Sequence, residues 1–182
     1  MRIYHGSLDV VEHPVILRPN RKLDYGEGFY TTTSESQAKE WVVRRMLEQK
    51  SACGYVNVYE FDNKKLNGFK SLFFSEPSEE WAAFVLANRT KKNFAHDYDI
   101  VYGPVANDRV YLQFGLYEAG AIGIDTLIRE LKTYKLVDQY LFHTERALAA
   151  LHFVEAVEVV RHTPSSTDIL TPMKTQEPDT NS

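Results

Sequence analysis

Two short stretches near the N-terminus decide the fold: Tyr4-His5-Gly6-Ser7 and, further along the chain, Tyr25-Gly26-Glu27-Gly28-Phe29-Tyr30-Thr31-Thr32. The first is a short apolar and aromatic run that stops at a glycine, where a backbone without Cβ can turn or approach a ligand closely. The second is a glycine-rich turn that enters aromatic and β-branched residues, which are typical of a strand. We therefore predict two β-strands joined by a loop.

The rest of the chain predicts strands and helices in mixed order. Strands are expected at 55–61, 99–102, 139–143 and 156–160, and helices at 37–49, 78–89, 125–134 and 145–151. Ser34 or Ser36, Ser78 and Thr144 are the expected N-caps, and Trp41 and Trp81 the expected core anchors. Residues 103–108 have the composition of a structured loop. Because strands and helices do not alternate regularly, an α+β fold with antiparallel strands is favoured over a doubly wound one.

Composition limits the class of protein. The 182 residues are 43% hydrophobic, which fits one domain over residues 1–161, and the tail at 162–182 is polar enough to predict disorder. The net charge of −4 gives no general attraction to nucleic acid or anionic lipid. A single cysteine, Cys53, excludes an intramolecular disulfide, and no run of apolar residues is long enough to span a membrane. We expect a soluble, cytoplasmic protein.

Three segments together resemble the NAD-binding core of the ADP-ribosyltransferases: His5-Gly6, Gly28-Phe29-Tyr30 and Asp138-Gln139-Tyr140-Leu141-Phe142. In that superfamily a His-Tyr-Glu triad lies on such strands, and here Gln139 takes the place of the glutamate. More narrowly, the chain is similar to the bacterial DUF3990 family, which shares the Gly-Pro-Val-Ala loop and the Gln-Tyr-x-Phe segment. The resemblance covers most of residues 1–160. It implies split antiparallel sheets flanked by helices, NAD as substrate, and ADP-ribose transfer to a macromolecule by a toxin with an antitoxin partner.

The resemblance also implies which residues bind NAD. The Gly6 backbone offers a donor and an acceptor to the nicotinamide carboxamide, and the His5 imidazole holds the adenosine ribose, with Ser7 as a second contact. Tyr30 stacks on the cationic nicotinamide ring, a contact of about 1 kcal/mol. Gly28 belongs to the strand that carries it, and Tyr25 or Tyr140 forms a second wall.

Gln139 is the departure from the triad. Cleavage of the nicotinamide–ribose bond develops positive charge on the ribose, which a carboxylate stabilises better than an amide. Gln139 can hold a ribose hydroxyl but cannot act as a general base. Asp138, Glu145 or the acceptor itself are the alternatives for that base. The substitution also motivates a second hypothesis, an NAD-binding or protein-interaction module without transfer chemistry, with NAD glycohydrolysis between the two.

Simpler explanations exist for the same residues. His5-Gly6 alone is most often a turn beside a satisfied histidine, and Gln139 can be a strand-edge amide among packing aromatics. The pair Asn107-Asp108 either contacts the acceptor or bonds its own turn, and Asn88-Arg89 offers donors for a diphosphate. The histidines lack metal-ligand spacing, so no metal is expected.

Overall fold

The computed structural model describes residues 1–18, 23–91, 94–104, 108–134 and 136–161, with side chains left undescribed at 108 and 109. The strands are β1 (Arg2–Ser7), β2 (Phe29–Thr32), β3 (Cys53–Phe61), β4 (Ser71–Phe73), β5 (Ile100–Pro104), β6 (Asp138–Phe142) and β7 (Leu151–Val160). The helices are α1 (Glu35–Gln49), α2 (Glu79–Thr90), α3 (Asp108–Glu118), α4 (Ile124–Lys132) and α5 (Glu145–Leu148), with a 3₁₀ turn at Asn63–Gly68.

All seven strands belong to one hydrogen-bonded sheet in the order β4-β5-β6-β2-β1-β3-β7. Every neighbouring pair is antiparallel except β4 and β5, which run parallel. This mixed fold with a mostly antiparallel sheet confirms the predicted α+β class at that level. The predicted separation into two sheets differs from the single sheet found. The joint between β1 and β2 is nevertheless only one residue pair, Tyr4 with Thr32.

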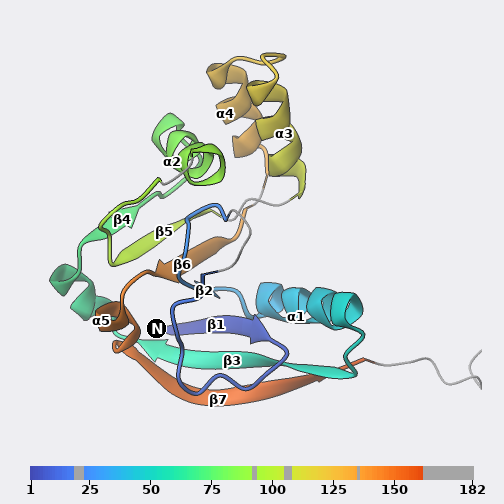
Figure 1. Ribbon diagram of the computed structural model, residues 1–182, viewed down its shortest axis with the longest axis vertical. Helices are drawn as coiled ribbons and strands as arrows, with labels where there is room; N and C mark the ends of the chain where they lie inside the picture. The colour runs from blue at the N-terminus through green and yellow to red at the C-terminus, as the bar shows by residue number, and fades with distance from the viewer. Residues whose placement is uncertain (19–22, 92–93, 105–107, 135, 162–182) are drawn as a thin grey trace, which may run out of the picture.

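Two groups of helices lie on the sheet, as Figure 1 shows: α1 beside β1, and α2, α3 and α4 together beyond β5 and β6. Three apolar clusters correspond to this arrangement. The first joins α2, α3 and α4 to β5 and β6 through Trp81, Phe114, Leu127 and Leu141. The second lies between the strands and α5 and includes Phe29, Tyr59, Tyr140 and Phe142. The third seats α1 on β3 through Ala38, Val42, Met46 and Val56.

The predicted helix N-caps are confirmed. The hydroxyls of Ser34, Ser78 and Thr144 accept hydrogen bonds from the backbone N–H groups of Gln37, Trp81 and Ala147. Each such cap is worth about 1 kcal/mol, because it satisfies a helix donor that has no partner within the helix. The three caps therefore fix where α1, α2 and α5 begin.

Several expectations need correction. Gly103 and Pro104 belong to β5, and the expected loop that follows falls at 105–107, outside the described residues. The helix α3 and the short strand β4 were not expected, and β7 begins at Leu151, so α5 ends sooner than predicted. Trp81 is fully buried as predicted, but Trp41 is 36% exposed and is not a core anchor. The tail at 162–182 also lies outside the described residues.

Within the part of the chain that the structure describes, no helix combines the length and the apolarity needed to cross a bilayer.

Candidate functional site

The sheet opens between β1 and β2 immediately after their one pair. Met1 and Phe61 exchange hydrogen bonds at 2.8 and 2.9 Å, so β1 residues with odd numbers direct their backbone groups toward β3. Because direction alternates along a strand, the N–H and C=O of Tyr4 and Gly6 point the other way, toward β2. A continued ladder would pair Gly6 with Tyr30, but no such pair forms. The polar groups of Gly6 therefore face the opening.

The His5 side chain occupies that opening from one side. Its Nδ1 lies 2.7 Å from the Tyr30 carbonyl oxygen, so Nδ1–H donates to the acceptor that Gly6 would otherwise have used. The imidazole also packs on Phe29, with ring centroids 4.4 Å apart. Burial lowers the pKa of His5, partly offset by the bond to Tyr30. The neutral imidazole thus takes the place of one backbone hydrogen bond between β1 and β2 and keeps the two strands apart.

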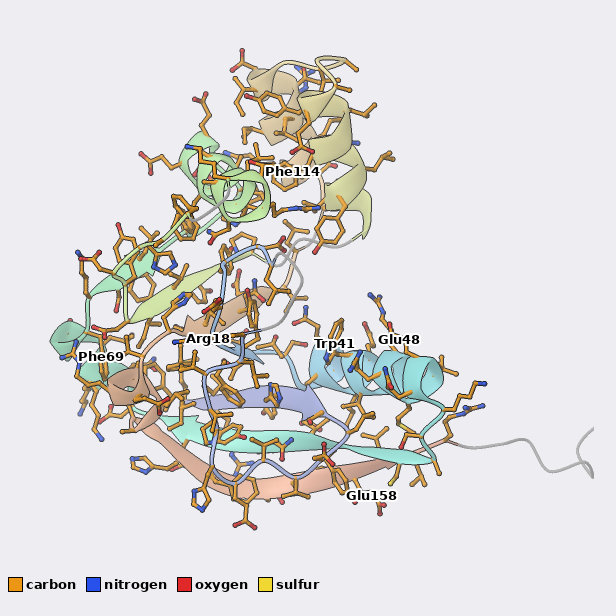
Figure 2. All side chains as sticks on the ribbon, viewed as in Figure 1. Arg18, Trp41, Glu48, Phe69, Phe114 and Glu158 are labelled. Atoms are coloured by element: carbon orange, nitrogen blue, oxygen red, sulfur yellow. The ribbon has the colours of Figure 1, made fainter. Side chains whose placement is uncertain are left out.

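Gly6 also has a packing role. A Cβ added there would lie 2.6 Å from the Ala38 carbonyl oxygen, 3.0 Å from Val42 Cγ2 and 3.1 Å from Trp41 Cδ1. Helix α1 therefore contacts the β1 backbone directly, which only glycine permits. The contact brings the half-exposed indole of Trp41 next to Gly6, and Figure 2 shows Trp41 on the margin of α1 nearer α3 in that view.

Tyr30 is anchored rather than free to rotate. Its hydroxyl donates to the Gly26 carbonyl at 2.8 Å and accepts from the Tyr25 N–H at 3.4 Å. Burial, with a smaller contribution from the Asp24 charge, raises the pKa of Tyr30 well above its usual value. The phenol is therefore neutral near neutral pH. Its ring is half-buried against the cluster that α2, α3 and α4 form on the sheet.

Gln139 lies on the same face of the sheet as Tyr30. It is opposite Thr32 on β2 and Gly103 on β5, and Thr32 is opposite Tyr4 on β1, so one row crosses four strands. Paired residues of neighbouring strands project to the same side. Gln139 is buried, with 7% of its surface exposed. The Tyr25 hydroxyl lies at this row, because a Cβ on Gly103 would be 2.5 Å from it.

The Tyr25 hydroxyl is held from several sides. It donates to the Pro104 carbonyl at 2.7 Å and accepts from Trp81 Nε1 at 2.6 Å. Burial raises the pKa of Tyr25, while its hydrogen bond to Trp81 and the nearby Gln139 amide oppose that rise. Tyr25 is thus a neutral buried support beneath Gln139, and its own ring is fully buried.

Other predicted site residues point elsewhere. Tyr140 alternates with Gln139 and packs on the opposite face, 4.5 Å from the Tyr102 ring and in contact with Phe61. The Asp138 carboxylate is also on that face, where it accepts the Tyr102 hydroxyl at 2.6 Å. Glu145 is exposed in the first turn of α5. The structure therefore brings Gly6, Tyr30 and Gln139 to one side, but not Tyr140 or the two suggested carboxylate bases. The predicted His5 and Ser7 side chains alternate with Gly6 and project to the opposite face, where His5 packs on Phe29 and the Ser7 hydroxyl accepts from the Asp9 N–H.

Comparison with known proteins gives one match, over residues 1–153, to the family described as "Protein of unknown function (DUF3990)". The chain belongs to this family. The match covers β1 to the first part of β7, and so includes His5, Tyr30, Gln139 and the strands that carry them. No curated protein and no solved structure matches the chain.

The Arg89 side chain of this DUF3990 protein lies at the end of α2 and is already engaged. Its guanidinium is 4.2 Å from the Tyr111 ring centroid, and Nη1 is 3.7 Å from Asp24 Oδ1. Nη1 is buried and makes no hydrogen bond among the described groups. Its predicted partner Asn88 donates to the Phe84 carbonyl. The other suggested pair, Asn107-Asp108, has no described side chains.

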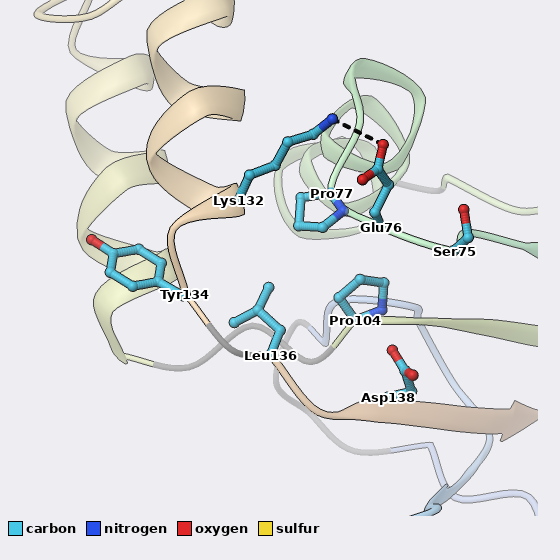
Figure 3. A pocket seen from close by; sticks show the side chains of 8 residues that line it. All are labelled: Ser75, Glu76, Pro77, Pro104, Lys132, Tyr134, Leu136 and Asp138. Carbon is cyan, nitrogen blue, oxygen red and sulfur yellow. Dashed lines mark hydrogen bonds and ion pairs between the residues drawn. The ribbon is translucent and has the colours of Figure 1, made fainter.

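A shallow cavity of about 320 Å³ opens where β5 and β6 meet the loops beside α2 and α4. Figure 3 shows the ion pair between Lys132 and Glu76 at its rim and the Asp138 side chain at its base. Its lining does not include Gly6, Tyr30 or Gln139. Among the described residues of this DUF3990 protein, no group of three or more His, Cys, Asp and Glu side chains could hold a metal ion.

Proposed function

We propose that this DUF3990 protein is an NAD-dependent mono-ADP-ribosyltransferase that binds NAD at the opening between β1 and β2. The observation that carries the proposal is the separation of the two strands after Tyr4. It leaves the Gly6 N–H and C=O facing the opening, with Tyr30 and Gln139 on the same side of the sheet. A carboxamide needs both a donor and an acceptor, and a backbone without a side chain offers both at close range.

Two aromatic side chains lie on this side of the sheet. Tyr30 lies on β2, and Trp41 lies against Gly6 from α1. Trp is the strongest of the aromatic side chains in binding a cation over its face, so the pair suits the cationic nicotinamide ring. We assign the second wall of the nicotinamide site to Trp41 rather than to Tyr140, which packs on the other face.

The chemistry follows from the residues on that face. The C1′–N bond breaks, nicotinamide leaves with the bonding pair, and the ribose becomes an oxocarbenium-like cation that the acceptor nucleophile attacks. Gln139 holds a ribose hydroxyl and orients the sugar. His5 keeps the strands apart through Nδ1, and its ring lies on the Phe29 face of the sheet, so the predicted ribose contact through Nε2 would come from the side opposite Tyr30 and Gln139. The Asp24 carboxylate, whose charge reaches Tyr30, is held by Arg89 and Tyr111, so the acceptor gives up its proton to solvent or to a base of its own.

The biological role belongs to the same proposal. A small bacterial transferase acting on a macromolecule in the cytoplasm would be harmful to its cell, and an antitoxin protein would restrain it. Gln139 favours the second candidate, an NAD-binding module or slow NAD glycohydrolase, because an amide stabilises the developing cation less than a carboxylate does.

Binding is tested by tryptophan fluorescence, because the chain has two tryptophans in opposite environments. Trp81 is fully buried, whereas Trp41 is at the site and 36% exposed. We expect NAD to quench the Trp41 emission and to raise the melting temperature, since saturation at 100 times Kd adds about 2.7 kcal/mol to stability. Trp41→Phe should abolish the quenching. Absence of both effects at millimolar NAD would refute the NAD site.

Transfer is tested with adenine-labelled NAD and a bacterial lysate, comparing wild type with Gln139→Glu and Gln139→Ala. If the sugar is oriented by residue 139, Gln139→Ala should lose nicotinamide release, and the carboxylate of Gln139→Glu should raise it by about tenfold or more. Label on macromolecules identifies the transferase. Nicotinamide release without label identifies the glycohydrolase, and binding with neither identifies the module.

A further inference from the structure

The two edges of the sheet are unlike. β4, at one edge, has three residues, whereas β7, at the other, has ten. Figure 1 shows β7 along the outer margin of the sheet, beyond β3. Natural proteins protect long edge strands with proline, lysine or bulges, because the unpaired backbone groups otherwise accept another strand. β7 contains neither proline nor lysine.

A bulge divides β7 and limits the regular part. The pairing of β3 with β7 shifts between Val58 and Tyr59, so Val154 has no partner. From Glu155 to Val160 the pairing with β3 is continuous. The regular segment, residues 155–160, is long enough for a short strand to dock along it.

The outward backbone groups of this segment can be assigned. The Arg161 N–H donates to the Ala52 carbonyl on the β3 side, so Val159, Val157 and Glu155 also direct their groups inward. Ala156, Glu158 and Val160 alternate with them and direct N–H and C=O away from the sheet. Within the described part of the chain no strand pairs with this edge.

The charge of the segment selects the kind of partner. Glu155 and Glu158 are exposed and lie on opposite faces of the strand, and neither forms an ion pair with a described residue. Figure 2 shows Glu158 at the outer side of β7. A second copy paired antiparallel about Glu158, the middle one of the three outward residues, would set the two Glu158 side chains directly opposite each other, and like charges in that position are destabilising.

We propose that the 155–160 edge of β7 binds an extended, basic segment of a partner protein by strand addition. The backbone groups of Ala156, Glu158 and Val160 supply the hydrogen bonds, as in other complexes that extend a sheet. Basic side chains on the two faces of the partner strand meet Glu155 and Glu158. Val160, 59% exposed, adds an apolar contact at the end of the segment. This surface is independent of the proposed NAD site.

The probe is a short labelled peptide of alternating Thr and Val with lysines opposite Glu155 and Glu158, and its matched control carries glutamates instead. Fluorescence anisotropy should show binding of the lysine peptide alone, weakening as salt rises. In Glu155→Lys/Glu158→Lys the preference should reverse. Ala156→Pro removes one outward N–H and no bond to β3, and should weaken binding at least about tenfold.

Amide hydrogen exchange gives a second measurement that needs no variant. The lysine peptide should slow exchange at Ala156, Glu158 and Val160, while Val157 and Val159, already bonded to β3, should change little. Failure of the lysine peptide to bind, binding that Ala156→Pro leaves unchanged while the variant remains folded, or protection elsewhere would overturn the proposal. So would a dimer of the chain held together through β7, seen by sedimentation and abolished by Ala156→Pro.

Discussion

Gly6→Ala is the sharpest test of how α1 is seated on the sheet. Its Cβ would lie 2.6 Å from the Ala38 carbonyl oxygen, a distance that real Cβ atoms do not show, and two further atoms are within 3.1 Å. The blocking atom belongs to the backbone of α1, so no side-chain rotation relieves it. Helix α1 cannot withdraw freely either, because Ala38, Val42 and Met46 are buried beneath it.

The magnitude follows from these contacts. Overpacking of this kind costs about 1–3 kcal/mol, while removal of a glycine from a strand returns at most about 0.5–1 kcal/mol. We expect a net loss of about 1–2 kcal/mol, and for a domain of this size about 2–4 °C in Tm per kcal/mol. Val42→Ala in the same chain would remove the 3.0 Å contact but not the 2.6 Å one, and it also empties a buried core position, so it should not restore stability.

The assay is urea unfolding followed by circular dichroism, with Gly115→Ala as the matched control. Gly115 is exposed within α3, and a Cβ there would meet nothing within 4 Å. Alanine is the better helix former by about 0.8–1 kcal/mol, so the control should be neutral or stabilised. A Gly6→Ala protein as stable as wild type would show that α1 does not rest on the β1 backbone.

Two further predictions concern the supports of the site. Tyr25→Phe removes the hydroxyl that joins Trp81 Nε1 to the Pro104 carbonyl. Leaving those two buried groups unsatisfied should lower the free energy of unfolding in urea by about 2–4 kcal/mol. A loss below about 0.5 kcal/mol would contradict this hydrogen-bonded bridge. His143 donates Nδ1–H to the Glu27 carbonyl, and burial beside His96 lowers its pKa to about 4. The unfolded chain binds this proton first, so stability should fall as pH drops from about 6.5 toward 4, by about 1–2 kcal/mol after solvent screening. In His143→Asn that part of the pH dependence should disappear, and an unchanged profile would contradict the assignment.

The sequence predicted those helices and strands whose apolar residues all pack against one neighbouring element. The side chains of β3 follow a period of two. The capping hydroxyls mark the starts of α1, α2 and α5 in the sequence itself. Helix α3 was missed because Gly115 interrupts a short stretch and its buried residues, Val110 and Phe114, make only one helical repeat. The helical spacing of Trp41 predicts a core position, but its side chain is 36% exposed. The buried face of α1 instead carries Ala38, Val42 and Met46, and Trp41 lies about 100° around the helix from Val42.

The arrangement of the candidate site depends on register, which a single sequence does not give. Whether Gly6 faces β2 or β3 is decided by the Met1–Phe61 pairing, more than fifty residues apart in the chain. Whether Tyr140 or Gln139 shares a face with Tyr30 is decided by the pairing of Thr32 with Gln139. A shift of one residue would reverse every such assignment. The residue types were therefore predictable, and their common side was not.

The structure gives two reasons for a glycine at position 6. Its missing Cβ seats α1, and its polar groups face the opening of the sheet. Loss of NAD binding in Gly6→Ala would therefore prove little, because the packing alone could cause it. Trp41 and Gln139 separate the two explanations. Trp41 is half-exposed, and Trp41→Phe keeps an aromatic ring beside Gly6, so the fold has little reason to change with it. If Trp41→Phe loses the NAD-induced rise in Tm and Gln139→Glu alters nicotinamide release, while the Tm of both variants without NAD remains that of wild type, the glycine and its neighbours form a binding site as well as the contact that holds α1.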